Sequence, residues 1–117
     1  MARLLIVDDD PDQLDIRQLV MEEAGHQVAT AADTQSALVE YDRHAPEIVL
    51  MDLRLPRTED GLELIRGLRQ RSPTVPILVL TGWPENVSTW PEGAMVNHFL
   101  RKPVRSQELL SLIDEIA

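Results

Sequence analysis

The sequence predicts an α/β domain in which helices cover both faces of a five-stranded parallel sheet. Five short apolar runs alternate with helical patterns along the 117 residues, an arrangement typical of right-handed βαβ units. The run Ile48–Met51 is continuously apolar, as expected of a strand that is buried on both faces. Most of the runs lead into a charged or polar residue, and open α/β sheets bind their ligands at such carboxyl ends.

The apolar runs and the residues that bracket them predict the order of the elements. Strands are expected at residues 3–7, 27–31, 48–51, 76–80 and 97–101. Helices are expected from Pro11 to Gly25, from Asp33 to Pro46, from about Gly61 to Arg71 and from about Ser106 to the end. Five such units in this length fit a flavodoxin-like, doubly wound sheet with the strand order 2-1-3-4-5.

The first and last helices have the clearest signals. Asp10 is a suitable N-cap, Pro11 suits the first helical position, and Gly25 is a typical stop. The residues of this helix that are predicted to face the core are Ile16, Leu19, Val20 and Ala24. In the last helix the predicted inward residues, at i, i+3, i+4 and i+7, are Leu109, Leu112, Ile113 and Ile116.

Two segments depart from a regular alternation. Pro84 can begin a helix but Pro91 must end it, so a helix between them has fewer than two turns. The fourth helix is therefore predicted to be short or irregular. Residues 57–60 are predicted to form a loop before the helix that begins near Gly61.

Composition restricts the classes of protein to which the chain can belong. Hydrophobic residues make up 44% and aromatic residues only 3%, which predicts a folded domain with an aliphatic core. A formal charge of −9 argues against direct nucleic acid or membrane partners. The absence of cysteine excludes disulfides and thiolate-bound metals, and no apolar run approaches the roughly 20 residues of a membrane span. We expect one soluble, cytoplasmic domain over residues 1–117.

The residues at the predicted strand ends are the candidates for chemistry. They are Asp8, Asp9, Asp52, Thr81 and Lys102. Each has a simpler explanation on its own, because the acidic residues can favour a helix N-terminus, the threonine can belong to a turn and the lysine can be solvated. Lys102 fits that explanation least, since it is the single lysine beside ten arginines. A compact ammonium in a tight site explains the exception.

In this combination and order, the residues resemble the receiver domain of two-component response regulators. The resemblance covers the whole chain and also includes Pro56, Gly61–Leu64 and Pro103. It implies that Asp52 accepts a phosphoryl group from the phosphohistidine of a sensor histidine kinase or phosphotransfer protein. It further implies that the domain catalyses only its own phosphorylation and dephosphorylation, and is otherwise not an enzyme.

The resemblance also assigns a role to each site residue. The residues implied to act on the phosphoryl group are Asp52, Thr81 and Lys102. Those implied to hold Mg²⁺ are Asp8, Asp9, Asp52 and the backbone carbonyl of Arg54, with Asp8 acting mainly through water. The bond between Lys102 and Pro103 is expected to be cis. Arg54 and Trp83 are hypothesised to shield the phosphoryl group from water and so to slow its hydrolysis.

A conformational switch is implied as well. Thr81 and Phe99 are the switch residues, and their movement would remodel the face formed by the fourth helix, the fifth strand and the last helix. Phe99 has the alternative of being an ordinary core residue. A homodimer that forms on phosphorylation is a partner that this face would allow, although the charged fourth-helix contacts of transcription-factor receivers are not evident.

Two other classes of function stay open at this point. Asp8 and Asp10 also resemble the motif of haloacid-dehalogenase-like phosphatases, which form an aspartyl phosphate at the first strand. Such enzymes need a further acidic pair after a strand beyond their lysine, and here only a helix follows Lys102. A protein-binding pseudo-receiver that is never phosphorylated is the second alternative, but such domains usually lose site residues.

Overall fold

The structure, a computed structural model, describes residues 1–87 and 89–117 and contains one parallel sheet with the strand order β2-β1-β3-β4-β5. The strands are β1 (Arg3–Val7), β2 (Gln27–Ala31), β3 (Ile48–Asp52), β4 (Ile77–Thr81) and β5 (His98–Arg101). The helices are α1 (Pro11–Glu23), α2 (Thr34–His44), α3 (Thr58–Arg71), α4 (Pro84–Val87), the 3-10 helix η1 (Pro91–Met95) and α5 (Ser106–Ile116). This confirms the predicted flavodoxin-like order. No helix of the described residues is long and apolar enough to cross a membrane.

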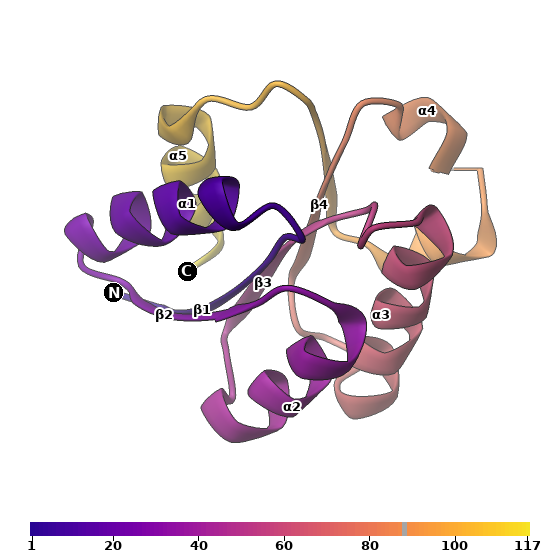
Figure 1. Cartoon of the computed structure of the whole chain (residues 1–117), viewed down its shortest axis with the longest axis horizontal. Coiled ribbons are helices and arrows are strands. Elements are labelled where there is room, and N and C mark those ends of the chain that lie inside the picture. The colour runs from indigo at the N-terminus through magenta and orange to yellow at the C-terminus, as the bar shows by residue number, and fades with distance from the viewer. Residues whose placement is uncertain (88) are drawn as a thin grey trace.

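The three central strands are buried on both faces, because successive side chains point to opposite sides of the sheet. One set packs toward α2 and α3: Leu5, Val7, Val49, Met51, Ile77 and Val79. The other set packs toward α1 and α5: Leu4, Ile6, Ile48, Leu50, Leu78 and Leu80. Figure 1 shows these two pairs of helices on opposite sides of the sheet. The continuous apolar runs of the sequence are explained by this double coverage.

The inward face of α1 differs from the prediction. Ile16 and Leu19 were expected in the core but are 53% and 58% exposed, and Ala24 is exposed as well. The helix instead buries Met21 completely, with Leu14 and Val20 packed against the same cluster. The inward stripe also contains Arg17, whose side chain is only 13% exposed. Arg17 interrupts the apolar pattern of the true inward face, so the prediction from apolar spacing selected the wrong face of α1. The inward face predicted for α5 is confirmed, with Leu109 and Ile113 buried.

The helix α3 begins three residues earlier than predicted, at Thr58 rather than Gly61. Residues 58–60 are therefore the first turn of a helix and not part of a loop. Asp60 accounts for the difference, because its carboxylate accepts a hydrogen bond from the backbone N–H of Arg57 at 3.2 Å. A side-chain acceptor at this position stabilises a helix start, and Asp60 stands in the turn where the helix dipole favours an acidic residue.

The fourth helix is short, as predicted. It has four residues, and η1 follows before β5. Val87 of α4 is buried in the core on the side of α2 and α3, and Met95 and Val96 pack against the same cluster. The face beside β5 is therefore built from two short helical pieces instead of one long helix.

Arg69 of α3 ties this irregular region to the rest of the fold. Its guanidinium donates to the carbonyl of Val75 at 2.7 Å, to the carbonyl of Met95 at 2.8 Å and to the Asn97 side-chain oxygen at 2.9 Å. Burial lowers the pKa of the Arg69 guanidinium from its ordinary value. The planar, five-donor fork of an arginine can reach several acceptors in different directions from one position. Arg69 thereby joins the residues that precede β4 and β5 to α3.

Candidate functional site

Three carboxylates meet at the carboxyl edge of the sheet. Asp8 and Asp9 follow β1, and Asp52 is the last residue of β3, the strand beside it. One oxygen from each of the three side chains lies within 4.8 Å of the others. Asp8 and Asp52 are buried, with 2% and 7% of their surface exposed. Three like charges in so little space repel one another, so the cluster needs cations.

Lys102 supplies one of these cations. Its Nζ lies 2.7 Å from Asp52 Oδ2 and donates a hydrogen bond to it. The lysine follows β5, and its backbone N–H donates to the carbonyl of Thr81 at 2.9 Å, which continues the pairing of β5 with β4 beyond the strand. The peptide bond between Lys102 and Pro103 is cis, as expected. The bond between Leu55 and Pro56 is also cis, which was not predicted.

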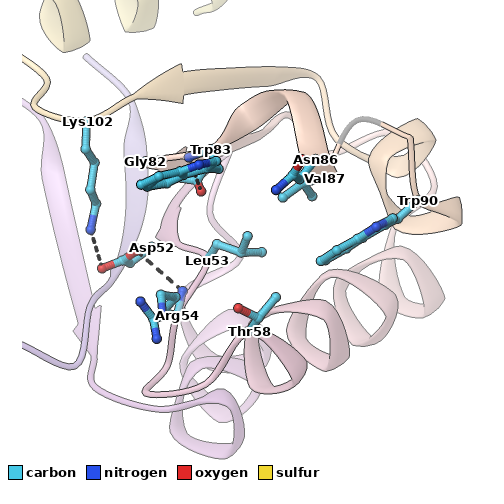
Figure 2. Close-up of a pocket in the computed structure, with 11 residues that line it drawn as sticks. Asp52, Leu53, Arg54, Thr58, Gly82, Trp83, Asn86, Val87, Trp90 and Lys102 are labelled. Carbon is cyan, nitrogen blue, oxygen red and sulfur yellow. Dashed lines mark hydrogen bonds and ion pairs between the residues drawn. The ribbon is translucent and has the colours of Figure 1, made fainter.

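A pocket of about 340 Å³ opens beside Asp52. Its lining includes Thr81, Lys102, Arg54, Trp83 and Trp90. Figure 2 shows Lys102 directed at Asp52, with Trp83 and Arg54 on opposite sides of the carboxylate and Trp90 at the far end. Thr81 Oγ1 accepts a hydrogen bond from the backbone N–H of Trp83 at 3.2 Å. The structure thus brings the predicted residues Asp52, Thr81 and Lys102 to one cavity.

The chain after Asp52 is held close to the site by α3. The backbone N–H of Arg54 points back to Asp52 Oδ1 at 3.4 Å. Gly61 of α3 lies directly against this segment, because a Cβ there would stand 1.8 Å from the carbonyl oxygen of Leu53. Only glycine permits such an approach of a helix to another backbone. The glycine therefore sets the position of the residues that follow Asp52.

Phe99 lies outside the pocket lining. It is half-buried in β5 and packs against the core cluster on the side of α2 and α3. Its assignment as a switch residue stays a prediction.

Arg17 is a site residue that the sequence analysis missed. Its guanidinium Nη1 donates to Asp8 Oδ2, and the pair is nearly buried. The second oxygen of Asp8 accepts from the backbone N–H of Asp10 at 2.9 Å. A signal was available, because Arg17 stands three residues after Leu14 and four before Met21, on the face that is otherwise apolar. A lone arginine at such a position needs a buried partner.

The arrangement can bind a hard cation and offer a carboxylate nucleophile beside an ammonium. The cluster provides oxygen atoms only, which are the ligands that Mg²⁺ prefers. The hydroxyl of Thr81 and the ammonium of Lys102 line the same pocket as Asp52, and both are suitable donors to a developing or transferred anion.

Comparisons with known proteins agree with this geometry. The response regulator receiver domain family matches residues 4–114. The chain is 35% identical over 114 residues to the virulence transcriptional regulatory protein PhoP of Salmonella typhimurium, covering 95% of this chain and 50% of that protein. It is 36% identical over 112 residues to the transcriptional regulatory protein PhoP of Escherichia coli, covering 93% of this chain and 49% of that protein. The chain thus spans about half the length of these relatives.

Solved structures give the same result for the fold. The chemotaxis response regulator CheY4 of Vibrio cholerae superimposes with a TM-score of 0.87 and 28% identity, over 100% of this chain and 99% of that one. NtrX of Brucella abortus superimposes with a TM-score of 0.85 and 26% identity, over 98% of this chain and 26% of that one. The family match extends from β1 into α5 and therefore covers every element that positions the site. The chain belongs to the family of response regulator receiver domains.

Proposed function

We propose that Asp52 is the residue of this chain that accepts the phosphoryl group, and that a phosphohistidine of a histidine kinase or phosphotransfer protein donates it in the cytoplasm. The observation that carries the proposal is the contact of 2.7 Å between Lys102 and Asp52 inside the acidic cluster. In the transfer, a carboxylate oxygen of Asp52 forms a bond to phosphorus while the bond from phosphorus to the imidazole nitrogen breaks. The nitrogen leaves with the electron pair. A carboxylate attacks without losing a proton, so no general base is needed.

We assign the Mg²⁺ site to Asp8, Asp9, Asp52 and the carbonyl of Arg54. The fit rests on the all-oxygen donor set, whose carboxylate atoms lie within 4.8 Å of one another. Both oxygens of Asp8 already accept hydrogen bonds, which favours a role for Asp8 through water rather than by direct contact. When bound, Mg²⁺ would relieve the repulsion among the carboxylates and balance charge on the phosphoryl oxygens.

Lys102 and Thr81 would stabilise the transferred group. The ammonium already lies at one oxygen of Asp52 and has three donors, so it can also reach a phosphoryl oxygen next to the new bond. The hydroxyl of Thr81 lines the same pocket and can donate to another oxygen, after it turns from its contact with the Trp83 backbone. The domain would in this way catalyse its own phosphorylation and dephosphorylation and no other reaction.

The output is proposed to run through the face of α4, β5 and α5, with Thr81 and Phe99 as the switch. Because α4 has four residues and η1 completes this side, a partner for this face would meet two short helical segments within the part of the chain that the structure describes. A homodimer that forms on phosphorylation remains part of the proposal. Light scattering of the protein with and without phosphorylation would detect it as a doubling of mass.

The alternatives from the sequence are not favoured. A phosphatase of the haloacid-dehalogenase type would use Asp8, but both oxygens of Asp8 are engaged by Arg17 and the Asp10 backbone. A pseudo-receiver without phosphorylation does not explain why every site residue is retained.

The test is covalent labelling with acetyl phosphate and Mg²⁺, read by intact mass. One phosphoryl group is expected on the parent protein and on Asp10→Asn, and none on Asp52→Asn. Asp10 is the matched control, because it adjoins the cluster yet serves as the N-cap of α1, a role that asparagine fills equally well. Unchanged labelling of Asp52→Asn would refute the assignment, and loss of label only in Asp8→Asn would favour the phosphatase.

A further inference from the structure

The acidic cluster carries its own counterions. Its three carboxylates contact two cationic side chains, Lys102 at Asp52 and Arg17 at Asp8. The formal charge of these five groups is −1, compared with −3 for the carboxylates alone. A protein without bound metal can therefore hold the three carboxylates together. Lys102 belongs to the reaction described above, but Arg17 has no part in it.

The ion pair between Arg17 and Asp8 lies in a nearly buried position, where electrostatic interactions are strong. The side chains are 13% and 2% exposed, so water and salt screen the pair only weakly. Arg17 reaches Asp8 from the inward stripe of α1, between Leu14 and Met21. Because the second oxygen of Asp8 accepts the Asp10 N–H, no oxygen of this carboxylate is without a donor.

A dication and a guanidinium compete for such a carboxylate. Mg²⁺ needs lone pairs directed toward it or toward its waters, whereas both oxygens of Asp8 receive N–H groups. Binding of the metal requires Arg17 either to release Asp8 or to stay as a second positive charge beside the ion. Both outcomes weaken the binding of Mg²⁺.

We infer that Arg17 is a resident counterion that competes with Mg²⁺ for Asp8, neutralising the cluster in the metal-free protein and raising the Mg²⁺ concentration at which Asp52 becomes reactive. The inference rests on the proposed Mg²⁺ site. Removing the charge of Arg17 should have opposite effects in the two states, since the metal-free cluster loses a counterion while the metal loses a competitor. A role in merely positioning Asp8 would instead weaken metal binding when Arg17 is removed.

The experiment compares the parent with Arg17→Gln, Arg17→Lys and Arg66→Gln. Arg66→Gln is the matched control, because it removes the same charge and an ion pair of 2.6 Å with Glu92, between α3 and η1. Mg²⁺ affinity is measured at constant ionic strength by tryptophan fluorescence, since Trp83 and Trp90 both line the pocket beside Asp52. Thermal unfolding is measured in EDTA and in saturating Mg²⁺.

Arg17→Gln is expected to bind Mg²⁺ roughly tenfold more tightly, a change of about 1.4 kcal/mol. Its unfolding temperature should fall in EDTA and recover in saturating Mg²⁺. Arg17→Lys and Arg66→Gln should bind Mg²⁺ within about twofold of the parent. Arg17→Lys keeps the charge, and Arg66 pairs with Glu92 rather than with a carboxylate of the acidic cluster. In an Asp8→Asn background, Arg17→Gln should change the Mg²⁺ affinity little, as a double-mutant cycle requires for a coupled pair.

Equal or weaker Mg²⁺ binding by Arg17→Gln would overturn the inference, and so would a gain in affinity that persists with Asp8→Asn. If none of the proteins binds Mg²⁺, the proposed metal site fails instead. Unfolding in EDTA then still tests the counterion role, which an unchanged unfolding temperature of Arg17→Gln would refute.

Discussion

Lys102 Nζ lies 2.7 Å from Asp52 Oδ2, although 50 residues separate the two in the sequence. Their strands, β5 and β3, are not neighbours in the sheet, since β4 runs between them. Asp52 ends β3 and Lys102 follows β5, so both residues lie at the carboxyl edge of the sheet. The contact forms because the side chain of Lys102 is long enough to pass the end of β4. A lysine has that length, and its ammonium is compact enough for the space beside a buried carboxylate.

Replacing Lys102 with arginine should slow phosphorylation without abolishing Mg²⁺ binding. The planar guanidinium cannot occupy the position of the ammonium, and loss of a preorganised donor typically costs roughly 100-fold in rate. The rate of labelling by acetyl phosphate, followed by intact mass, measures the effect. Arg105→Lys, on an exposed arginine at the start of α5, should label at the parent rate. Equal rates for Lys102→Arg and the parent would contradict the role of Lys102.

The aspartyl phosphate is expected to hydrolyse slowly because Trp83 and Arg54 flank Asp52. Both side chains line the pocket through which water must approach. Trp83→Ala and Arg54→Ala should each speed the loss of phosphate by roughly threefold or more, a decrease of about 0.7 kcal/mol in the barrier. Trp90→Ala is the control, since Trp90 lines the same pocket at its far end. If the first two variants lose phosphate no faster than Trp90→Ala, neither side chain is a shield.

Gly61→Ala should destabilise the protein and disturb the site. A Cβ at this position meets the backbone carbonyl of Leu53 at 1.8 Å, so α3 or the chain after Asp52 must move. A cost of roughly 1–3 kcal/mol in the free energy of unfolding is expected, as for other overpacked positions. Gly67→Ala is a matched control in the same helix, because its Cβ meets only the movable side chain of Leu38 at 3.0 Å. Urea unfolding measures both, and a Gly61→Ala protein as stable as Gly67→Ala would disprove the packing argument.

The N-cap of α2 should give a stability contribution that depends on pH. Hydrogen bonds from the Ser36 backbone N–H and then from its hydroxyl lower the pKa of Asp33 from its ordinary value of 3.8. A lowered pKa in the folded state means that the contribution is complete above the unfolded value and is lost as the pH falls through the folded one. Asp33→Ala should therefore cost about 1 kcal/mol at pH 7 and less at about pH 3.

Urea unfolding at the two pH values tests this expectation. Asp33→Asn is the control, since asparagine caps equally well and does not titrate. A difference between Asp33→Ala and the parent that is the same at both pH values would exclude a titrating cap.

The sequence by itself determined the strands, their order and most of the site. A strand buried on both faces has to be apolar throughout, so runs such as Ile48–Met51 identify the sheet without knowledge of the contacts. Parallel strands end at one edge, so Asp8, Asp52, Thr81 and Lys102 could be expected together from their places after such runs. The two prolines fixed the short α4, because a proline cannot continue a helix.

The tertiary structure alone decided the features that depend on contacts between distant elements. The inward face of α1 contains Arg17 because its guanidinium pairs with the buried carboxylate of Asp8, just after β1. This ion pair offsets the free-energy cost of burying the arginine. Apolar periodicity does not identify which residue is the partner of Arg17, and it favoured Ile16 and Leu19 as inward residues. Gly61 was part of a recognisable pattern, but its close approach to Leu53 is a property of how α3 packs. Local sequence patterns determine the secondary structure that a segment adopts, whereas tertiary packing decides which face of that segment contacts the site.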